Sequence, residues 1–64
     1  MSHIWVNTNQ FVTVTYDGDS SFLRIKMTDG SEWFKAMTWE EANDFVTVCS
    51  SFQFVELKHF IIQK

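Results

Sequence analysis

Only one stretch of this 64-residue chain, residues 38–51, has the pattern of an amphipathic helix, and it constrains the fold more than any other feature. Thr38 and Glu41 have the spacing of a capping box, in which each side chain accepts a hydrogen bond from a backbone N–H at the helix start. Apolar residues then recur at helical spacing: Ala42, Phe45, Val46 and Cys49. The rest of the chain must therefore pack against a single helix.

The segments on either side of this helix have the alternating or β-branched composition of strands. They are residues 11–16, 22–28, 31–37 and 52–62, and residues 4–6 are equally compatible with a short strand or a loop. The predicted fold is α+β, with a single helix packed on one face of a mainly antiparallel four-stranded sheet in the order β-β-β-α-β. A right-handed crossover places the last strand beside residues 11–16. A closed SH3-like barrel is the alternative, and the long helix counts against it.

The Asp29-Gly30 pair favours a two-residue type I′ turn, which fixes how the flanking strands face each other. Such a turn sets Arg24 opposite Lys35 and Ile25 opposite Phe34. The core beneath the helix is then predicted to contain Leu23, Ile25, Phe34, Ala36, Val12, Val14, Val55 and Leu57. Outward positions are predicted for Phe11, Phe54, Glu56, Lys58 and Phe60.

The same register gathers basic and aromatic side chains on the face that the helix leaves uncovered. These residues are Phe22, Arg24, Lys26, Trp33 and Lys35. Because contiguous exposed apolar area bordered by charge is unusual on a monomer, this face is the predicted partner-binding surface. A second candidate is the acidic face at the helix start, formed by Glu40, Glu41 and Asp44; an ordinary solvated first turn explains the same residues.

Composition indicates one small domain spanning residues 1–64. Hydrophobic residues make up 45% of the chain and aromatic residues 17%, which is too apolar for a disordered segment. The single cysteine, Cys49, excludes a disulfide within one chain and favours a reducing compartment. Without a signal-peptide pattern or a long apolar run, the expected location is the cytoplasm, with no membrane contact. The net charge of -3 argues against general nucleic-acid binding.

No residue pattern in the chain indicates catalysis, a metal site or a cofactor. His3 and His59 lie far apart in sequence, and Cys49 completes no zinc-ligand spacing with them. Gly18 and Gly30 occupy expected turns rather than a phosphate-binding loop. We therefore expect a protein that is not an enzyme.

The chain has a strand–strand–helix–strand plan. Its helix opens with Thr38-Trp39-Glu40-Glu41-Ala42, and its aromatic last strand includes the segment from Phe52 to Leu57. In size and plan it resembles small bacteriophage-encoded host-takeover proteins. That resemblance implies a stoichiometric inhibitor or adaptor that blocks a host protein in the host cytoplasm by occupying its surface. The alternative is a nucleic-acid-binding or homodimeric module that uses the basic and aromatic sheet face.

Overall fold

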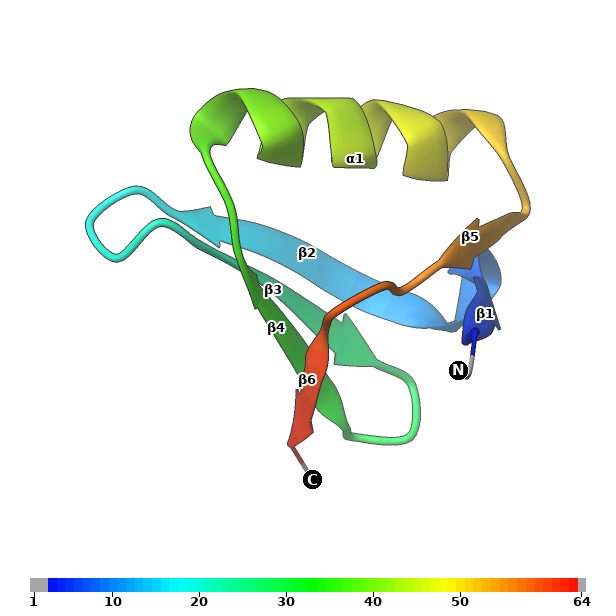
Figure 1. Ribbon diagram of the computed structural model, residues 1–64. Helices are drawn as coiled ribbons and strands as arrows, with labels where there is room; N and C mark the ends of the chain where they lie inside the picture. The colour runs from blue at the N-terminus through cyan, green and yellow to red at the C-terminus, as the bar shows by residue number, and fades with distance from the viewer. Residues whose placement is uncertain (1–2, 64) are drawn as a thin grey trace.

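One α-helix lies across two antiparallel sheets in the computed structural model, which describes residues 3–63 (Figure 1). The elements are β1 (Trp5–Asn7), the 3-10 helix η1 (Thr8–Gln10), β2 (Phe11–Asp17), β3 (Phe22–Met27), β4 (Glu32–Ala36), α1 (Trp39–Ser51), β5 (Phe54–Glu56) and β6 (Ile61–Gln63). Strands β2-β3-β4-β6 form one sheet, and β1-β5 form the other. The predicted α+β fold, with a single helix on a mainly antiparallel sheet, is confirmed.

Helix α1 begins with the predicted capping box. The Glu41 N–H donates to Thr38 Oγ1 at 3.2 Å, and the Thr38 N–H donates to Glu41 Oε1 at 3.0 Å. Ala42 is only 1% exposed, and Phe45 and Cys49 pack half-buried against the core. Val46 is 42% exposed, so the predicted apolar stripe is narrower than its four residues because Val46 lies at the edge of the contact.

The predicted last strand is divided, and its predicted place beside β2 is wrong. Residues Phe54–Glu56 pair with β1, whereas Ile61–Gln63 pair with β4. Between them the backbone of His59 adopts a positive φ of 64°, which turns the chain from one sheet to the other. The larger sheet therefore has the order β2-β3-β4-β6. Within residues 3–63, β2 and β6 do not pair with each other, so this sheet is open rather than a closed barrel.

The turn between β3 and β4 has three residues, Thr28 to Gly30, instead of the predicted two. The Gly30 N–H donates to the Met27 carbonyl at 3.1 Å, and the Met27 N–H donates to the Ser31 carbonyl at 2.9 Å. Gly30 alone in this turn has a positive φ, 89°, as in a type I turn followed by a left-handed residue. The Asp29 carboxylate stabilises this form because it accepts from the Ser31 N–H at 2.9 Å and the Ser31 hydroxyl at 2.6 Å.

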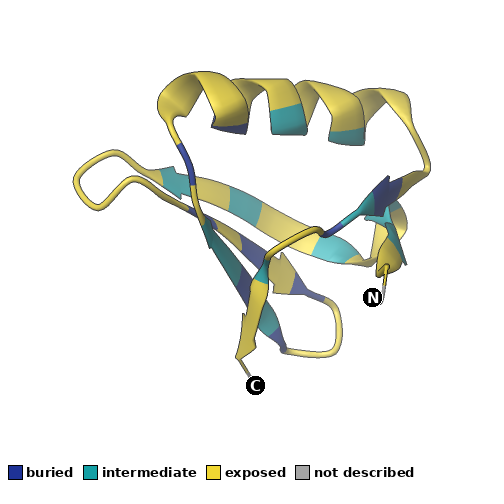
Figure 2. Cartoon of the chain, in the orientation of Figure 1, coloured by how far each residue is buried: buried dark blue, intermediate teal, exposed yellow. Residues whose placement is uncertain are grey.

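The extra turn residue shifts the register by one and turns every β4 side chain to the other face. Ile25 lies opposite Trp33, and Arg24 lies opposite Phe34. Trp33 is 8% exposed and belongs to the core, while Phe34 and Ala36, which were predicted to be core residues, lie on the face away from α1. The buried apolar positions are among those coloured dark blue in Figure 2; they are Leu23, Ile25, Met27, Trp33, Met37, Ala42, Val55 and Leu57.

A β-bulge in β2 exchanges the predicted positions of two neighbouring residues. The pairing of β2 with β3 shifts between Phe11 and Thr13. As a result Phe11 packs against the core, and Val12 is 56% exposed, the reverse of the prediction. Phe60 was also predicted to point outward, yet it packs half-buried against the core. The predictions for Val14, Val55 and Leu57 as core residues are confirmed.

Candidate functional site

The structure divides the predicted partner-binding residues between two sides of the larger sheet. Phe22, Arg24 and Lys26 lie together on the face away from α1, as predicted. Trp33 and Lys35 lie on the other side because of the register shift. Trp33 is buried, so it supports the fold and offers no exposed contact surface.

We call the uncovered side of the larger sheet the sheet face, formed by Thr13, Thr15, Asp17, Phe22, Arg24, Lys26, Glu32, Phe34, Ala36, Ile61 and Gln63. The Arg24 guanidinium lies 5.3 Å from the centre of the Phe34 ring, and its Nε lies 3.7 Å from Glu32 Oε1. Phe22 is 41% exposed and Ile61 66%. The sheet face is therefore mixed in charge and partly apolar rather than uniformly basic.

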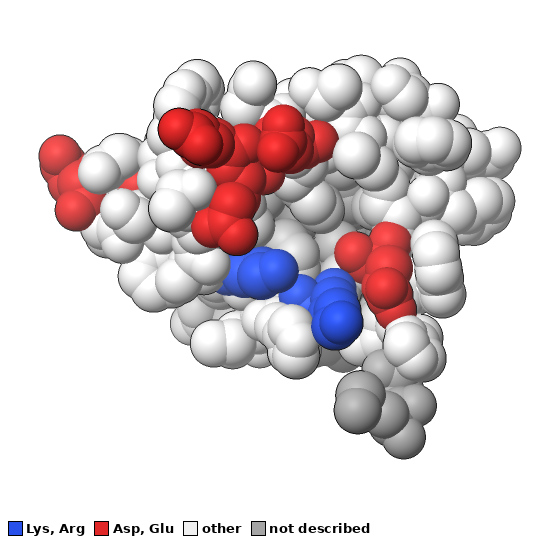
Figure 3. All heavy atoms as spheres, turned by 45° about the horizontal axis from the view of Figure 1, so that its top comes forward, with Lys and Arg blue, Asp and Glu red and all other residues white. Residues whose placement is uncertain are grey.

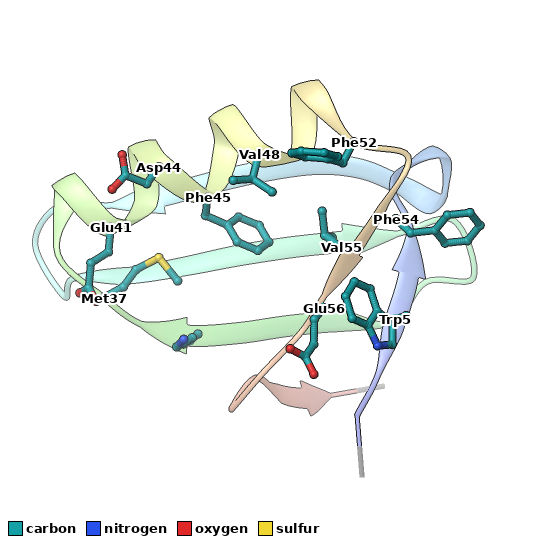
Figure 4. Close-up of a pocket in the computed structure, with 11 residues that line it drawn as sticks. Trp5, Met37, Glu41, Asp44, Phe45, Val48, Phe52, Phe54, Val55 and Glu56 are labelled. Carbon is teal, nitrogen blue, oxygen red and sulfur yellow. The ribbon is translucent and has the colours of Figure 1, made fainter.

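A second, more apolar surface lies between α1 and the small β1-β5 sheet. We call it the aromatic groove, a hollow of about 590 Å³ whose exposed apolar side chains are Trp5, Val48, Phe52 and Phe54 (Figure 4). Trp5 is 63% exposed, Phe52 61% and Phe54 54%. Three exposed aromatic rings around one hollow form contiguous exposed apolar area. On soluble proteins such areas are rare, and the larger ones mark interaction sites.

Local structure explains why these rings face solvent. In the β1-β5 ladder Val6 lies opposite Val55, and this pair faces the core. Side chains alternate along a strand, so Trp5 and Phe54 must point to the other side. Phe52 follows α1 directly as its C-cap residue, and its N–H donates to the Val48 carbonyl at 3.0 Å. The backbone thereby holds all three rings at the same end of the groove.

Carboxylates border the aromatic groove on both sides. Glu41 and Asp44 reach it from α1, and Glu56 reaches it from β5 (Figure 4). The Glu56 carboxylate is hydrogen-bonded to His3. Lys35 also lines the groove, with its Nζ 5.7 Å from the centre of the Phe60 ring. In Figure 3, acidic side chains (red) gather over the helix, and a separate acidic group lies to the right of the basic side chains (blue). Of the predicted acidic face, Glu40 is exposed on α1 but does not line the groove.

The pKa of the Glu41 carboxyl lies below its ordinary value, chiefly because it accepts the backbone N–H of Thr38. A lowered pKa stabilises the fold in full above the ordinary glutamate pKa of 4.5, and this contribution is lost as the pH falls through the lower, folded value. We expect the Glu41→Gln variant, which keeps an amide oxygen for the cap, to be less stable than the wild type at pH 7. The difference should shrink as the pH falls through the lowered pKa of the folded-state Glu41 carboxyl.

Urea denaturation of both proteins at a series of pH values measures this difference. Asp17 also has a lowered pKa, chiefly because its carboxylate accepts the Asp19 N–H. Asp17 is unchanged in both proteins, so its effect on the pH dependence of stability cancels in their difference. A stability difference that stays constant between pH 7 and pH 3 would show that the charge of Glu41 does not act at the helix start.

Burial raises the pKa of the Cys49 thiol, which therefore stays protonated at neutral pH. Among residues 3–63, no group of three or more His, Cys, Asp and Glu side chains is placed to hold a metal ion. Helix α1 is also too short to cross a bilayer, and no other helix in that range is long and apolar enough.

Sequence reasoning missed the groove because its residues come from three separate segments. Phe54 and Glu56 were predicted to point outward, but on the same side as Arg24. The pairing of β5 with β1 places them beside Trp5 instead. The one sequence signal for the groove is the aromatic content, 17% of the chain, which exceeds what a core of this size can bury.

Comparison of the chain with protein-family models, with curated proteins and with solved structures finds no match.

Proposed function

We propose that this protein is a small protein-binding inhibitor or adaptor that blocks a host protein by stoichiometric surface occlusion. The observation that carries the proposal is the aromatic groove, in which Trp5, Phe52 and Phe54 are each more than half exposed. Aromatic anchors in a hollow are the residues that most often supply binding energy at protein interfaces. The resemblance to phage-encoded host-takeover proteins supports a bacterial host and an occlusion mechanism.

Charge suggests the kind of surface that fits. Glu41, Asp44 and Glu56 border the groove, and the chain as a whole has a net charge of -3. A partner surface with apolar side chains surrounded by Lys and Arg would be complementary to it. Nucleic acid is the weaker candidate, because its phosphates would meet these carboxylates, and the sheet face combines Arg24 and Lys26 with Glu32.

Affinity capture from bacterial lysate with quantitative mass spectrometry tests the proposal. The wild-type chain should retain one protein in a 1:1 ratio, and a Phe52→Ser, Phe54→Ser double variant should lose it. A Phe22→Ser, Ile61→Ser double variant is the matched control, since it removes two exposed apolar side chains from the sheet face. Equal retention by all three proteins would contradict the groove as the binding site.

A further inference from the structure

The sheet face has a regular pattern that the proposed function does not use. Across β3 and β4 the facing pairs are Phe22 with Ala36, Arg24 with Phe34 and Lys26 with Glu32. Each pair joins two complementary side chains: a large one with a small one, a cation with an aromatic ring, and a cation with an anion. Strands β3 and β4 are also the two central strands of the four-stranded sheet.

We propose that the sheet face binds a second copy of this chain around a two-fold axis that runs along the strands between β3 and β4. Such an axis places β3 of one copy over β4 of the other. Lys26 then meets Glu32 of the second copy, and Glu32 meets Lys26 of the second copy. A closed two-fold interface requires a patch that is complementary to itself, and this pattern meets that requirement.

The remaining pairs agree with the same axis. Within each copy the Arg24 guanidinium lies 5.3 Å from the centre of its own Phe34 ring, and the axis brings it beside the Phe34 ring of the second copy as well, where a guanidinium next to an aromatic ring is favourable. Ala36 has the smaller side chain of the first pair, which leaves space for the ring of Phe22 of the second copy. At the sheet margins Ile61, which is 66% exposed, approaches Thr15 of the second copy. No like charges meet at Lys26 or Glu32.

The size of the sheet face sets the strength of this contact. The four strands have 7, 6, 5 and 3 residues, and with about 4.8 Å between strands they cover roughly 19 Å by 17 Å on each copy. That footprint is less than half of the roughly 800 Å² per partner of a standard interface, so we expect a weak, reversible dimer with a Kd on the order of 10–100 µM. The aromatic groove lies on the helix side of the molecule, and the dimer leaves it accessible in both copies.

Charge-reversed variants provide a sharp test, with mass measured by sedimentation equilibrium up to about 1 mM. The wild type should approach twice its 7.6 kDa mass as concentration rises. Lys26→Glu alone sets carboxylates against Glu32 of the second copy, and Glu32→Lys alone sets two cations together, so each variant should dimerise at least about tenfold more weakly. An equimolar mixture of the two variants should recover the wild-type affinity, because both contacts are again between opposite charges.

Recovery in the mixture separates the dimer from an effect within one chain, where Lys26 and Glu32 are also neighbours. Circular dichroism confirms that each single variant is folded. A monomeric wild type at 1 mM, single variants that dimerise normally, or a mixture that does not recover would each overturn the proposal. Weaker oligonucleotide binding by Lys26→Glu and stronger binding by Glu32→Lys, with no dimer, would assign the sheet face to nucleic acid.

Discussion

Replacing Trp33 by alanine should destabilise the protein by about 3–5 kcal/mol. Trp33 is 8% exposed and lies opposite Ile25, which is fully buried at the centre of the core. Truncating its indole leaves a cavity that this small core cannot close. Since small domains are stable by only about 5–15 kcal/mol, and a chain of this length is expected near the lower limit, a large fraction of the variant should be unfolded.

Chemical denaturation followed by circular dichroism measures this effect, with Trp5→Ala as the control. Trp5 has the same side chain but is 63% exposed, so its removal should cost less than about 1 kcal/mol. If Trp33→Ala proves too unstable to measure, Trp33→Phe should still lower the stability by about 1–2 kcal/mol. A Trp33→Ala variant as stable as Trp5→Ala would mean that Trp33 faces solvent, and that the three-residue turn is wrong.

Replacing Phe52 by alanine should weaken partner binding about 30-fold or more, which is the effect of removing an interface hot spot. The Phe52 ring is 61% exposed and lines the aromatic groove beside Phe54. Its truncation removes contact area without opening the core, so the free energy of unfolding should change little. Titration calorimetry with the captured partner gives the affinity, and Phe22→Ala on the sheet face should bind as the wild type does.

Asp44→Lys tests the acidic border of the same groove. Because Asp44 is exposed at the margin, its charge should affect the rate of association more than the rate of dissociation. We expect slower association and a weaker dependence of that rate on salt, measured by surface plasmon resonance. Faster dissociation with unchanged association would instead indicate that Asp44 makes a buried contact with the partner.

The sequence was sufficient to predict those elements whose signals are local. The capping box between Thr38 and Glu41 specifies the helix start through two hydrogen bonds within four residues. Strict alternation of apolar residues in β3 likewise identifies Leu23 and Ile25 as core positions, since one face of the strand is buried. Both signals depend on neighbours in sequence, and both were correct.

The register of β4 could not be predicted because Asp-Gly is compatible with more than one hairpin turn. The choice depends on whether the Asp29 carboxylate accepts hydrogen bonds from Ser31, as it does here. One additional turn residue is enough to move Trp33 from the surface to the core. The bulge at Val12 and the positive φ of His59 also leave no mark in the apolar pattern. The bulge changes which β2 side chains face the core, and His59 lies where the chain passes from β5 to β6.

The aromatic groove could not be predicted for the same reason. It forms only because β5 pairs with β1, which brings Phe54 beside Trp5 across almost the whole length of the chain. The sequence indicated that some aromatic surface must remain exposed, but pairing between distant strands decided where that surface lies. The acidic residues Glu41 and Asp44 were identified from the helix pattern, and the fold places them at the border of this groove.

Site-specific photo-crosslinking in bacterial cells shows which of the two surfaces meets a partner protein. A photoreactive phenylalanine analogue is incorporated in place of Phe52 in one protein and in place of Phe22 in another. We expect the analogue at position 52 to form one crosslinked product with a partner protein, because the ring at this position lines the aromatic groove. The analogue at position 22 should crosslink only to a second copy of the chain. A partner crosslinked at position 22 and absent at position 52 would contradict the account.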